Sequence, residues 1–278
     1  MSEVLVIGAA GKTGRAVTRA LLARGAVVRA AVRPGSTSTP YAGPSVHVVP
    51  LDLVSGTGLP VAVAGVDAVY HLAPNVHPDE VGMARRVAEA AAAEGISHFA
   101  FHSVLHPDDS SMPHHVRKGE AERTVRDVVP SAVVLRPAAY HQNLVDAALA
   151  GRIAVPYSLD TPFTNVDLDD VAEVAALVLT EEGHEGSTHD LAGSESLSVR
   201  DLAAVATEVL ERPVETVAVP LQEWLDGAAA SLPEQARDDL AAMFRSYDRE
   251  GLVGDPSDLR ALLGREPRTW RDVLVRAA

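Results

Sequence analysis

The chain contains no cysteine, few aromatic residues and no long apolar run. Without thiols it cannot form disulfides, use a thiolate nucleophile or hold a metal through cysteine. No stretch approaches the roughly 20 apolar residues that cross a bilayer, and the first residues resemble a strand rather than a charged leader. We therefore expect a cytoplasmic protein that does not enter a membrane.

Basic residues are also scarce relative to acidic ones. The 278 residues include 24 Lys and Arg against 38 Asp and Glu, which gives a formal net charge of −14. Such a charge disfavours non-specific binding of nucleic acid. We expect a small-molecule substrate instead, and a monomer or a homodimer.

A glycine-rich turn follows the first apolar run, Val4–Ile7, and precedes a helical pattern that ends at Gly25. Its spacing is G-x-x-G-x-x-G, with Gly8 permitting a tight turn, Gly11 letting a ligand approach the backbone, and Gly14 letting the helix pack on the sheet. Free N–H groups at such a helix start suit a pyrophosphate. The turn therefore predicts a dinucleotide site, although an ordinary glycine turn would look similar.

Strand and helix patterns alternate along the first half of the chain. This alternation predicts an α/β fold with a doubly wound parallel sheet. Residues 1–150 should form this domain, and residues 151–278 a smaller α+β lobe over it, with segments such as Asp167–Val171 returning to the main sheet. Further strands are expected at Val27–Val32, Val46–Pro50, Asp67–Leu72, Ser97–Ser103 and Ala132–Pro137, with helices at Asp79–Glu94 and Met112–Val128.

The end of the second strand carries Arg33, where a site for NAD usually has an acidic residue. A guanidinium there suits the 2′-phosphate of NADP, and Ser36 and Lys12 are candidate further donors. Arg33 could equally be a solvated strand end. Asp52, after the third strand, is a candidate partner of the adenine amine or a cap of the following turn.

Ligands of such sheets bind at the carboxyl ends of the strands, which makes Ser103 a candidate site residue. His71 and His102 lie inside apolar strands and are expected to be hydrogen-bonded core residues. His106 lies outside the predicted helix that carries His114 and His115, and no carboxylate converges on the three, so no metal site is expected.

Several of these landmarks together resemble the NmrA-like atypical short-chain dehydrogenases/reductases. They are Gly8–Gly14, Arg33, His102–Pro107, Met112–His115 and Leu135–Asn143. The resemblance implies an NAD(P)-binding Rossmann domain with a small C-terminal lobe, in a family of NADPH-dependent quinone and carbonyl reductases and of nucleotide-sensing regulators. It implies a cofactor site made of the glycine turn, the segments after the strands and one helix lysine: Gly8, Ala10, Gly11, Lys12, Thr13, Gly14, Arg33, Ser36, Asp52, Leu53, Leu72, Ala73, Pro74, Ser103, Lys118 and Pro137.

Short-chain reductases use Ser, Tyr and Lys for catalysis, and the resemblance assigns Ser103 and Lys118 to two of these positions. A tyrosine four residues before the lysine would lie on the same helix face, but His114 stands there. The proton would then come from His114, from water or from the substrate's own acidic phenol. His114 is the candidate acid, because histidine donates protons near neutral pH. Tyr140 and Asn143 follow the sixth strand and are candidate substrate contacts.

These residues predict an NADPH-dependent reductase of a quinone or another conjugated or aromatic carbonyl compound. A quinone needs only a weak acid, because its reduced oxyanion is a weak base. Two alternatives remain: a non-catalytic sensor of NADP(H), which the missing tyrosine would suit, and a non-redox isomerase or cyclase on the same scaffold.

Overall fold

The structure, a computed structural model, describes residues 2–278. The chain forms two compact units. The first comprises the residues up to Pro107 together with Arg117–Arg136 and Val171–His189, and the second comprises Asp108–Val116, Pro137–Asp170 and Asp190–Ala278. Helices α4 and α6 and strands β6 and β8 thus run from one unit into the other.

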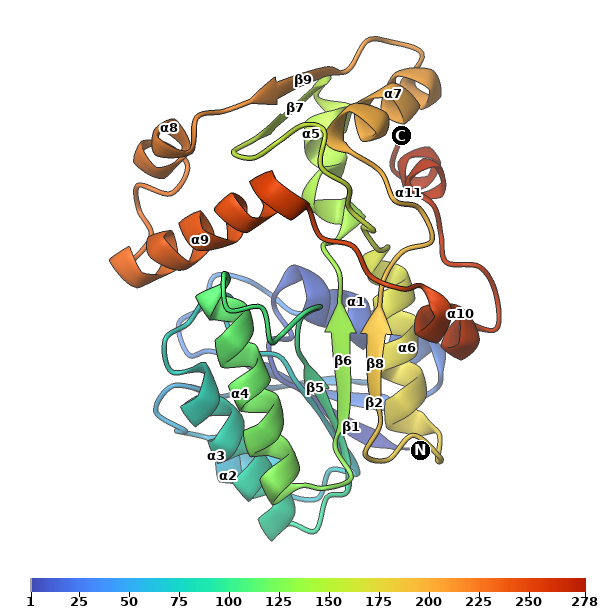
Figure 1. Ribbon diagram of the computed structural model, residues 1–278. Coiled ribbons are helices and arrows are strands. Elements are labelled where there is room, and N and C mark those ends of the chain that lie inside the picture. The colour runs from blue at the N-terminus through green and yellow to red at the C-terminus, as the bar shows by residue number, and fades with distance from the viewer. Residues whose placement is uncertain (1) are drawn as a thin grey trace. The chain divides into compact units, whose positions relative to one another are not determined.

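A seven-stranded sheet organises the first unit, with the strand order β3-β2-β1-β4-β5-β6-β8 (Figure 1). The pairs from β3 through β6 are parallel, which confirms the expected sheet. Helices cover both faces of the sheet, so its strands can be apolar on both sides. This is why they appear in the sequence as nearly continuous apolar, β-branched runs. The bounds are β1 Glu3–Val6, β2 Val27–Val32, β3 Val46–Pro50, β4 Ala68–His71, β5 His98–His102, β6 Val133–Pro137 and β8 Thr188–Leu191.

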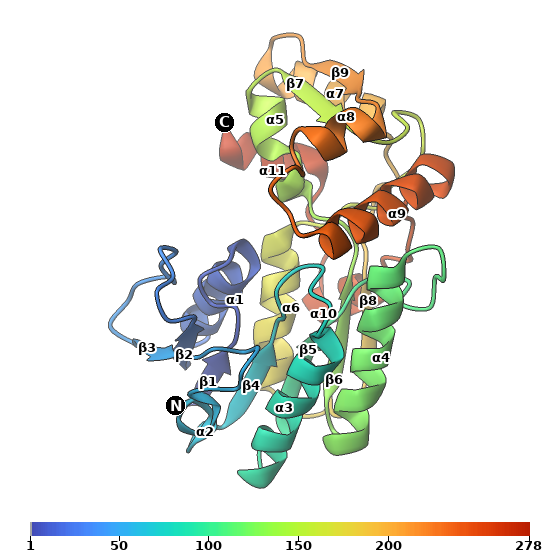
Figure 2. The ribbon, with the colours of Figure 1, turned by 90° about the vertical axis from the view of Figure 1, so that its left-hand side faces the viewer.

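Helices lie on both faces of this sheet (Figure 2). On one face, α2 (Leu59–Val63), α3 (Glu80–Ala93) and α4 (Pro113–Val128) contribute to an apolar core with the buried strand side chains of Val69, Phe99 and Phe101. On the other face lie α1 (Lys12–Ala23) and α6 (Leu168–Thr180). The sequence pattern did not predict the short helix α2, and it did not place β8 in the main sheet.

The second unit is built around the side chain of Trp270. Its indole is fully buried and donates a hydrogen bond from Nε1 to the Leu202 carbonyl oxygen at 2.8 Å. Strands β7 and β9 form a parallel two-stranded sheet. The elements are η1 His141–Asn143, α5 Val145–Leu149, β7 Arg152–Val155, α7 Val199–Leu210, β9 Glu215–Ala218, α8 Leu221–Asp226, α9 Glu234–Glu250, α10 Ser257–Leu263 and α11 Trp270–Ala277.

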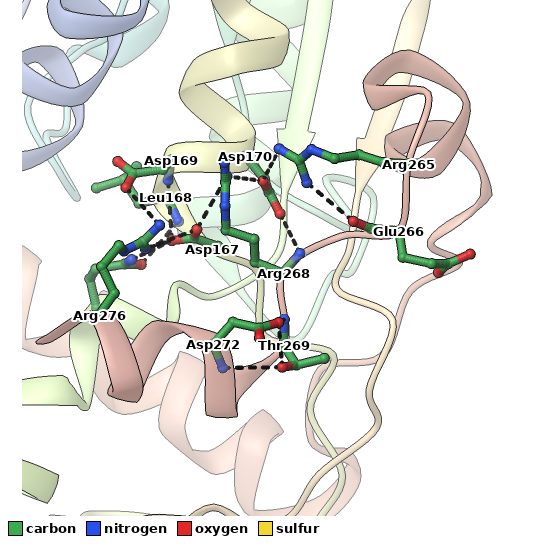
Figure 3. A network of polar contacts seen from close by, with 11 residues as sticks. Asp167, Leu168, Asp169, Asp170, Arg265, Glu266, Arg268, Thr269, Asp272 and Arg276 are labelled. Carbon is green, nitrogen blue, oxygen red and sulfur yellow. Dashed lines mark hydrogen bonds and ion pairs between the residues drawn. The ribbon is translucent and has the colours of Figure 1, made fainter. Parts of the chain in front are cut away.

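Two fully buried carboxylates hold the segment from α10 to α11 in place (Figure 3). Asp170 accepts hydrogen bonds from the Arg265 and Arg268 guanidiniums and from the Arg268 backbone N–H. Asp167 receives the Arg276 guanidinium, with 3.0 Å to each carboxylate oxygen. Burial raises the pKa of Asp170, and its hydrogen bond to Arg265 opposes that shift. The network therefore fixes residues about a hundred positions apart in the chain.

Across residues 2–278, no helix has the length and the apolar character to cross a membrane.

Candidate functional site

The glycine turn lies between β1 and α1, as the spacing predicts. Gly8 has a φ of +78°, a conformation that side chains with a Cβ rarely adopt. A Cβ on Gly14 would overlap the Gly8 carbonyl oxygen, so the helix can pack this closely only with glycine there. The roles assigned to Gly8 and Gly14 thus follow from the protein's own backbone.

Gly11 differs from the other two glycines. It is the N-cap residue of α1 with an extended backbone, and a Cβ there would meet only the Gly8 carbonyl oxygen, at an ordinary 3.4 Å. Packing within the chain therefore does not require glycine at this position. Close approach of a ligand to the backbone would require it.

The start of α1 is open to an anion. Among residues 2–278, which the structure describes, the N-cap residue Gly11 makes no side-chain cap hydrogen bond, and the first turn carries no acidic residue. Lys12 is exposed in this turn, and Ala10 and Thr13 are half-buried beside it. The uncapped N–H groups and the helix dipole both favour a phosphate at this position.

Arg33 is exposed just beyond the end of β2. The Ser36 N–H donates to the Arg33 carbonyl oxygen at 3.0 Å, which closes a turn at the edge where β1 and β2 end. Asp52 accepts hydrogen bonds from the Val54 and Ser55 N–H groups at 3.0 and 3.4 Å and therefore caps the turn after β3. Hydrogen bonds to Ser55 are the main cause of its lowered pKa, and the Arg33 charge contributes less.

Ser103 lies one residue beyond β5 and is buried. Its hydroxyl is hydrogen-bonded to Oε1 of Glu122 on α4. Arg136, on the neighbouring strand β6, holds the same carboxylate through Nε at 3.0 Å from Oε1 and Nη2 at 2.6 Å from Oε2. Ser103 is thus tied to an ion pair that connects α4 to the sheet.

Lys118 is buried on α4, with its ammonium 2.5 Å from a carboxylate oxygen of Glu80 on α3. It also donates to the His102 carbonyl oxygen at 3.0 Å and lies 5.4 Å from the centre of the Phe101 ring. An ammonium has three N–H donors, so these two contacts leave one.

The two strand histidines differ in their partners. His102 Nδ1 lies 2.6 Å from the Tyr70 hydroxyl, as expected for a hydrogen-bonded core residue. His71 stacks on Phe101 with 5.5 Å between ring centres, and neither of its ring nitrogens has a hydrogen-bond partner within residues 2–278. Burial, together with the smaller effect of the Lys118 charge, lowers the pKa of each histidine to about 3.

The remaining candidate residues divide between the units. Leu53, Leu72, Ala73 and Pro74 follow β3 and β4 in the first unit. His114, Pro137, Tyr140 and Asn143 belong to the second unit. There, His114 is buried with its ring 5.8 Å from that of His115, and the Asn143 N–H donates to the Tyr140 carbonyl oxygen. In the described chain, no group of three or more His, Asp or Glu residues is arranged to hold a metal ion.

Sequence reasoning missed Glu80, Glu122 and Arg136. Glu122 lies one helical turn after Lys118, so its position on that helix was available as a signal. The pairing of Glu122 with Arg136 could not be predicted from the sequence, because that contact joins a helix to a strand.

A parallel sheet in this order, with a glycine turn between its first strand and first helix, defines the Rossmann class of nucleotide-binding folds. The chain belongs to the NmrA-like family, whose family model matches residues 1–271. The resemblance noted in the sequence is thereby confirmed.

Two curated relatives match over nearly their whole length. An NAD(P)H azoreductase of Xenophilus azovorans is 27% identical over 276 residues, covering 97% of this chain and 96% of the relative. A (4-alkanoyl-5-oxo-2,5-dihydrofuran-3-yl)methyl phosphate reductase of Streptomyces griseus is 30% identical over 279 residues, covering 97% and 95%. Among solved structures, the NADPH complex of the Escherichia coli quinone oxidoreductase QOR2 has a TM-score of 0.81 at 23% identity, covering 99% of each chain.

Proposed function

We propose that this protein is an NADPH-dependent reductase of quinones or other conjugated or aromatic carbonyl compounds. The names of the azoreductase, the dihydrofuranyl phosphate reductase and the quinone oxidoreductase support a reductase, and two of these names include NAD(P)H or NADPH. The proposal is carried by the start of α1. Its N-cap residue Gly11 makes no side-chain cap hydrogen bond within residues 2–278, and packing in this part of the chain does not require glycine there.

In this proposal the start of α1 binds the pyrophosphate through its N–H groups. Arg33, with Ser36 and Lys12, binds the 2′-phosphate, because a guanidinium pairs with a phosphate through two hydrogen bonds. The N–H that Lys118 retains is available to a ribose hydroxyl. NADPH, when bound, supplies a hydride to the acceptor.

The proton has a different source from that of ordinary short-chain reductases, because no tyrosine precedes Lys118 by one helical turn. His114 takes this position on α4 and is the proposed acid. An acceptor whose reduced oxyanion is weakly basic suits this arrangement, which favours a quinone over a simple ketone. Tyr140 and Asn143 are the proposed substrate contacts.

The test follows NADPH oxidation at 340 nm with menadione, an azo dye and an aromatic ketone as acceptors, and with NADH in parallel. We expect turnover of menadione with NADPH. Replacing His114 with Phe should lower that turnover if His114 supplies the proton. Binding of NADPH without turnover of any acceptor would instead indicate a nucleotide-sensing protein.

Two glycine variants separate cofactor binding from folding. Gly11→Ala places a methyl group at the proposed pyrophosphate site, and calorimetry should show NADPH affinity lowered about tenfold or more, which corresponds to the loss of roughly 1.4 kcal/mol. Gly43→Ala is the matched control, because a Cβ there also meets only ordinary contacts, 3.7 Å or more away. Equal affinities of the two variants would refute the proposed pyrophosphate site.

A further inference from the structure

The hydrogen bond between Ser103 and Glu122 determines what Ser103 can offer to a ligand. A serine hydroxyl has one proton to donate and two lone pairs that accept. The Ser103 hydroxyl is hydrogen-bonded to Glu122 Oε1, and both residues are buried. The direction of this one hydrogen bond therefore sets the polarity of the serine.

Arg136 fixes that direction. Its Nε and Nη2 donate to both oxygens of Glu122, the two-point pairing of a guanidinium with an ionised carboxylate. An ionised carboxylate accepts hydrogen bonds and cannot donate them. The proton of the hydrogen bond is therefore the serine's own.

We infer that Glu122, held by Arg136, is a positioning residue that fixes the Ser103 proton, so that Ser103 presents only lone pairs and binds a hydrogen-bond donor on the substrate. This inference rests on the proposed function and on the expectation from the sequence that Ser103, at the carboxyl end of β5, lies beside the substrate. Within the described chain, no donor contacts the Ser103 hydroxyl oxygen, so its lone pairs are not already used.

The inference narrows the substrate class. A serine that polarises a carbonyl must donate its proton to the carbonyl oxygen, whereas this serine cannot do so while Glu122 holds that proton. It selects acceptors that carry their own O–H or N–H beside the reducible group, such as hydroxyquinones and hydroxyl-substituted azo compounds. Simple quinones bind without this contact.

The test uses binding of ligands that cannot be reduced, so that it does not depend on turnover. Calorimetry with the NADP⁺-saturated protein compares 1-naphthol, which donates a hydrogen bond, with 1-methoxynaphthalene, which does not. We expect the preference for naphthol over its ether to be about fivefold greater in the wild type than in Ser103→Ala, as one net hydrogen bond would give.

Replacing Glu122 with Gln should reverse the polarity of the serine. Arg136 reaches Oε2 through both Nε, at 3.2 Å, and Nη2, at 2.6 Å, so the amide oxygen of the glutamine is expected at that position. The amide N–H group then takes the position of Oε1, faces Ser103 and donates to it. The serine proton is then free to point at the ligand. The amide occupies one of the two serine lone pairs, and the freed proton can point at the oxygen of either ligand. We expect Glu122→Gln to reduce the preference for naphthol and to bind 1-tetralone, a carbonyl acceptor, more tightly than the wild type.

Glu120→Gln is the control, because Glu120 is exposed on the same helix and its replacement removes the same charge. It should keep the wild-type preference. A preference that is equal in wild type and Ser103→Ala would overturn the inference. So would an undiminished preference for naphthol, or an unchanged affinity for 1-tetralone, in a folded Glu122→Gln protein. If those preferences change as expected but no acceptor is reduced by NADPH, the polarity of Ser103 stands and the proposed reductase activity fails.

Discussion

Acidification from pH 6.5 to pH 5 should destabilise the protein through three buried histidines. Burial, reinforced by the Lys118 charge, lowers the pKa of His71 and His102 to about 3. Burial also lowers the pKa of His141 to about 4, against the opposing charge of Asp167. All three stay neutral in the folded protein at pH 5, while in the unfolded chain they take up protons below the ordinary histidine pKa of 6.5.

The sign and the size follow from proton linkage. For a histidine whose folded pKa is lowered, the stabilisation is present above pH 6.5 and is lost as the pH falls toward the folded pKa. Between pH 6.5 and pH 5, each such histidine lowers the free energy of unfolding by about 1 to 2 kcal/mol. Three of them lower it by about 5 kcal/mol, which is comparable to the whole stability of many domains.

Urea unfolding followed by circular dichroism at a series of pH values measures this loss. His71→Phe removes one of the three groups and keeps an aromatic ring stacked on Phe101. The free energy of unfolding of the variant should fall by about 1 to 2 kcal/mol less than that of the wild type over the same pH interval. Its free energy of unfolding at pH 7 should also be higher by about 1 kcal/mol or more, because within residues 2–278 the two buried ring nitrogens of His71 have no hydrogen-bond partner.

His47→Gln is the control, because His47 is exposed and meets water in both states. Its pH dependence should match that of the wild type. If His71→Phe and the wild type lose the same free energy between pH 6.5 and pH 5, His71 does not remain neutral in the folded protein, and the reasoning is refuted.

Three further predictions concern the ion-pair network, the glycine turn and the choice of cofactor. Asp170→Asn should lower the free energy of unfolding, measured in urea, by about 3 kcal/mol. This is the low end of the range for a broken buried ion pair, because the Arg265 and Arg268 side chains are about a third exposed and water can hydrate them. Gly14→Ala should yield a poorly folded or markedly less thermostable protein, since a Cβ there overlaps the Gly8 carbonyl oxygen, and an unchanged melting temperature would contradict that packing. Arg33→Asp should weaken NADPH binding about tenfold or more in calorimetry and leave NADH binding nearly unchanged; equal losses would reject the assignment of Arg33 to the 2′-phosphate.

The parallel sheet could be predicted from the sequence because its strands are short apolar runs bounded by glycine, proline and polar residues. Helix periodicity likewise predicted α3 and α4 to within a residue or two. The helix α2 was missed because five residues are too few to show a helical period. The glycine turn was predictable because its residues are neighbours in the sequence.

Contacts between distant elements could not be predicted in this way. Asp52 had two possible roles in the sequence, and the structure shows it capping its turn. His71 was expected to have a hydrogen-bond partner, and that prediction was wrong, because its stacking on Phe101 places its nitrogens among apolar side chains. The environment of Ser103 depends on a helix and a strand that pack only after folding.

The carboxylates of the ion-pair network also constrain how the chain folds during synthesis. Asp170 emerges from the ribosome 98 residues before Arg268, and Asp167 emerges 109 residues before Arg276. Until those arginines have been translated, burial of either carboxylate would leave a charge without a counter-ion. The nascent second unit must therefore keep this region hydrated, and its final closure waits for the arginines of the α10–α11 segment.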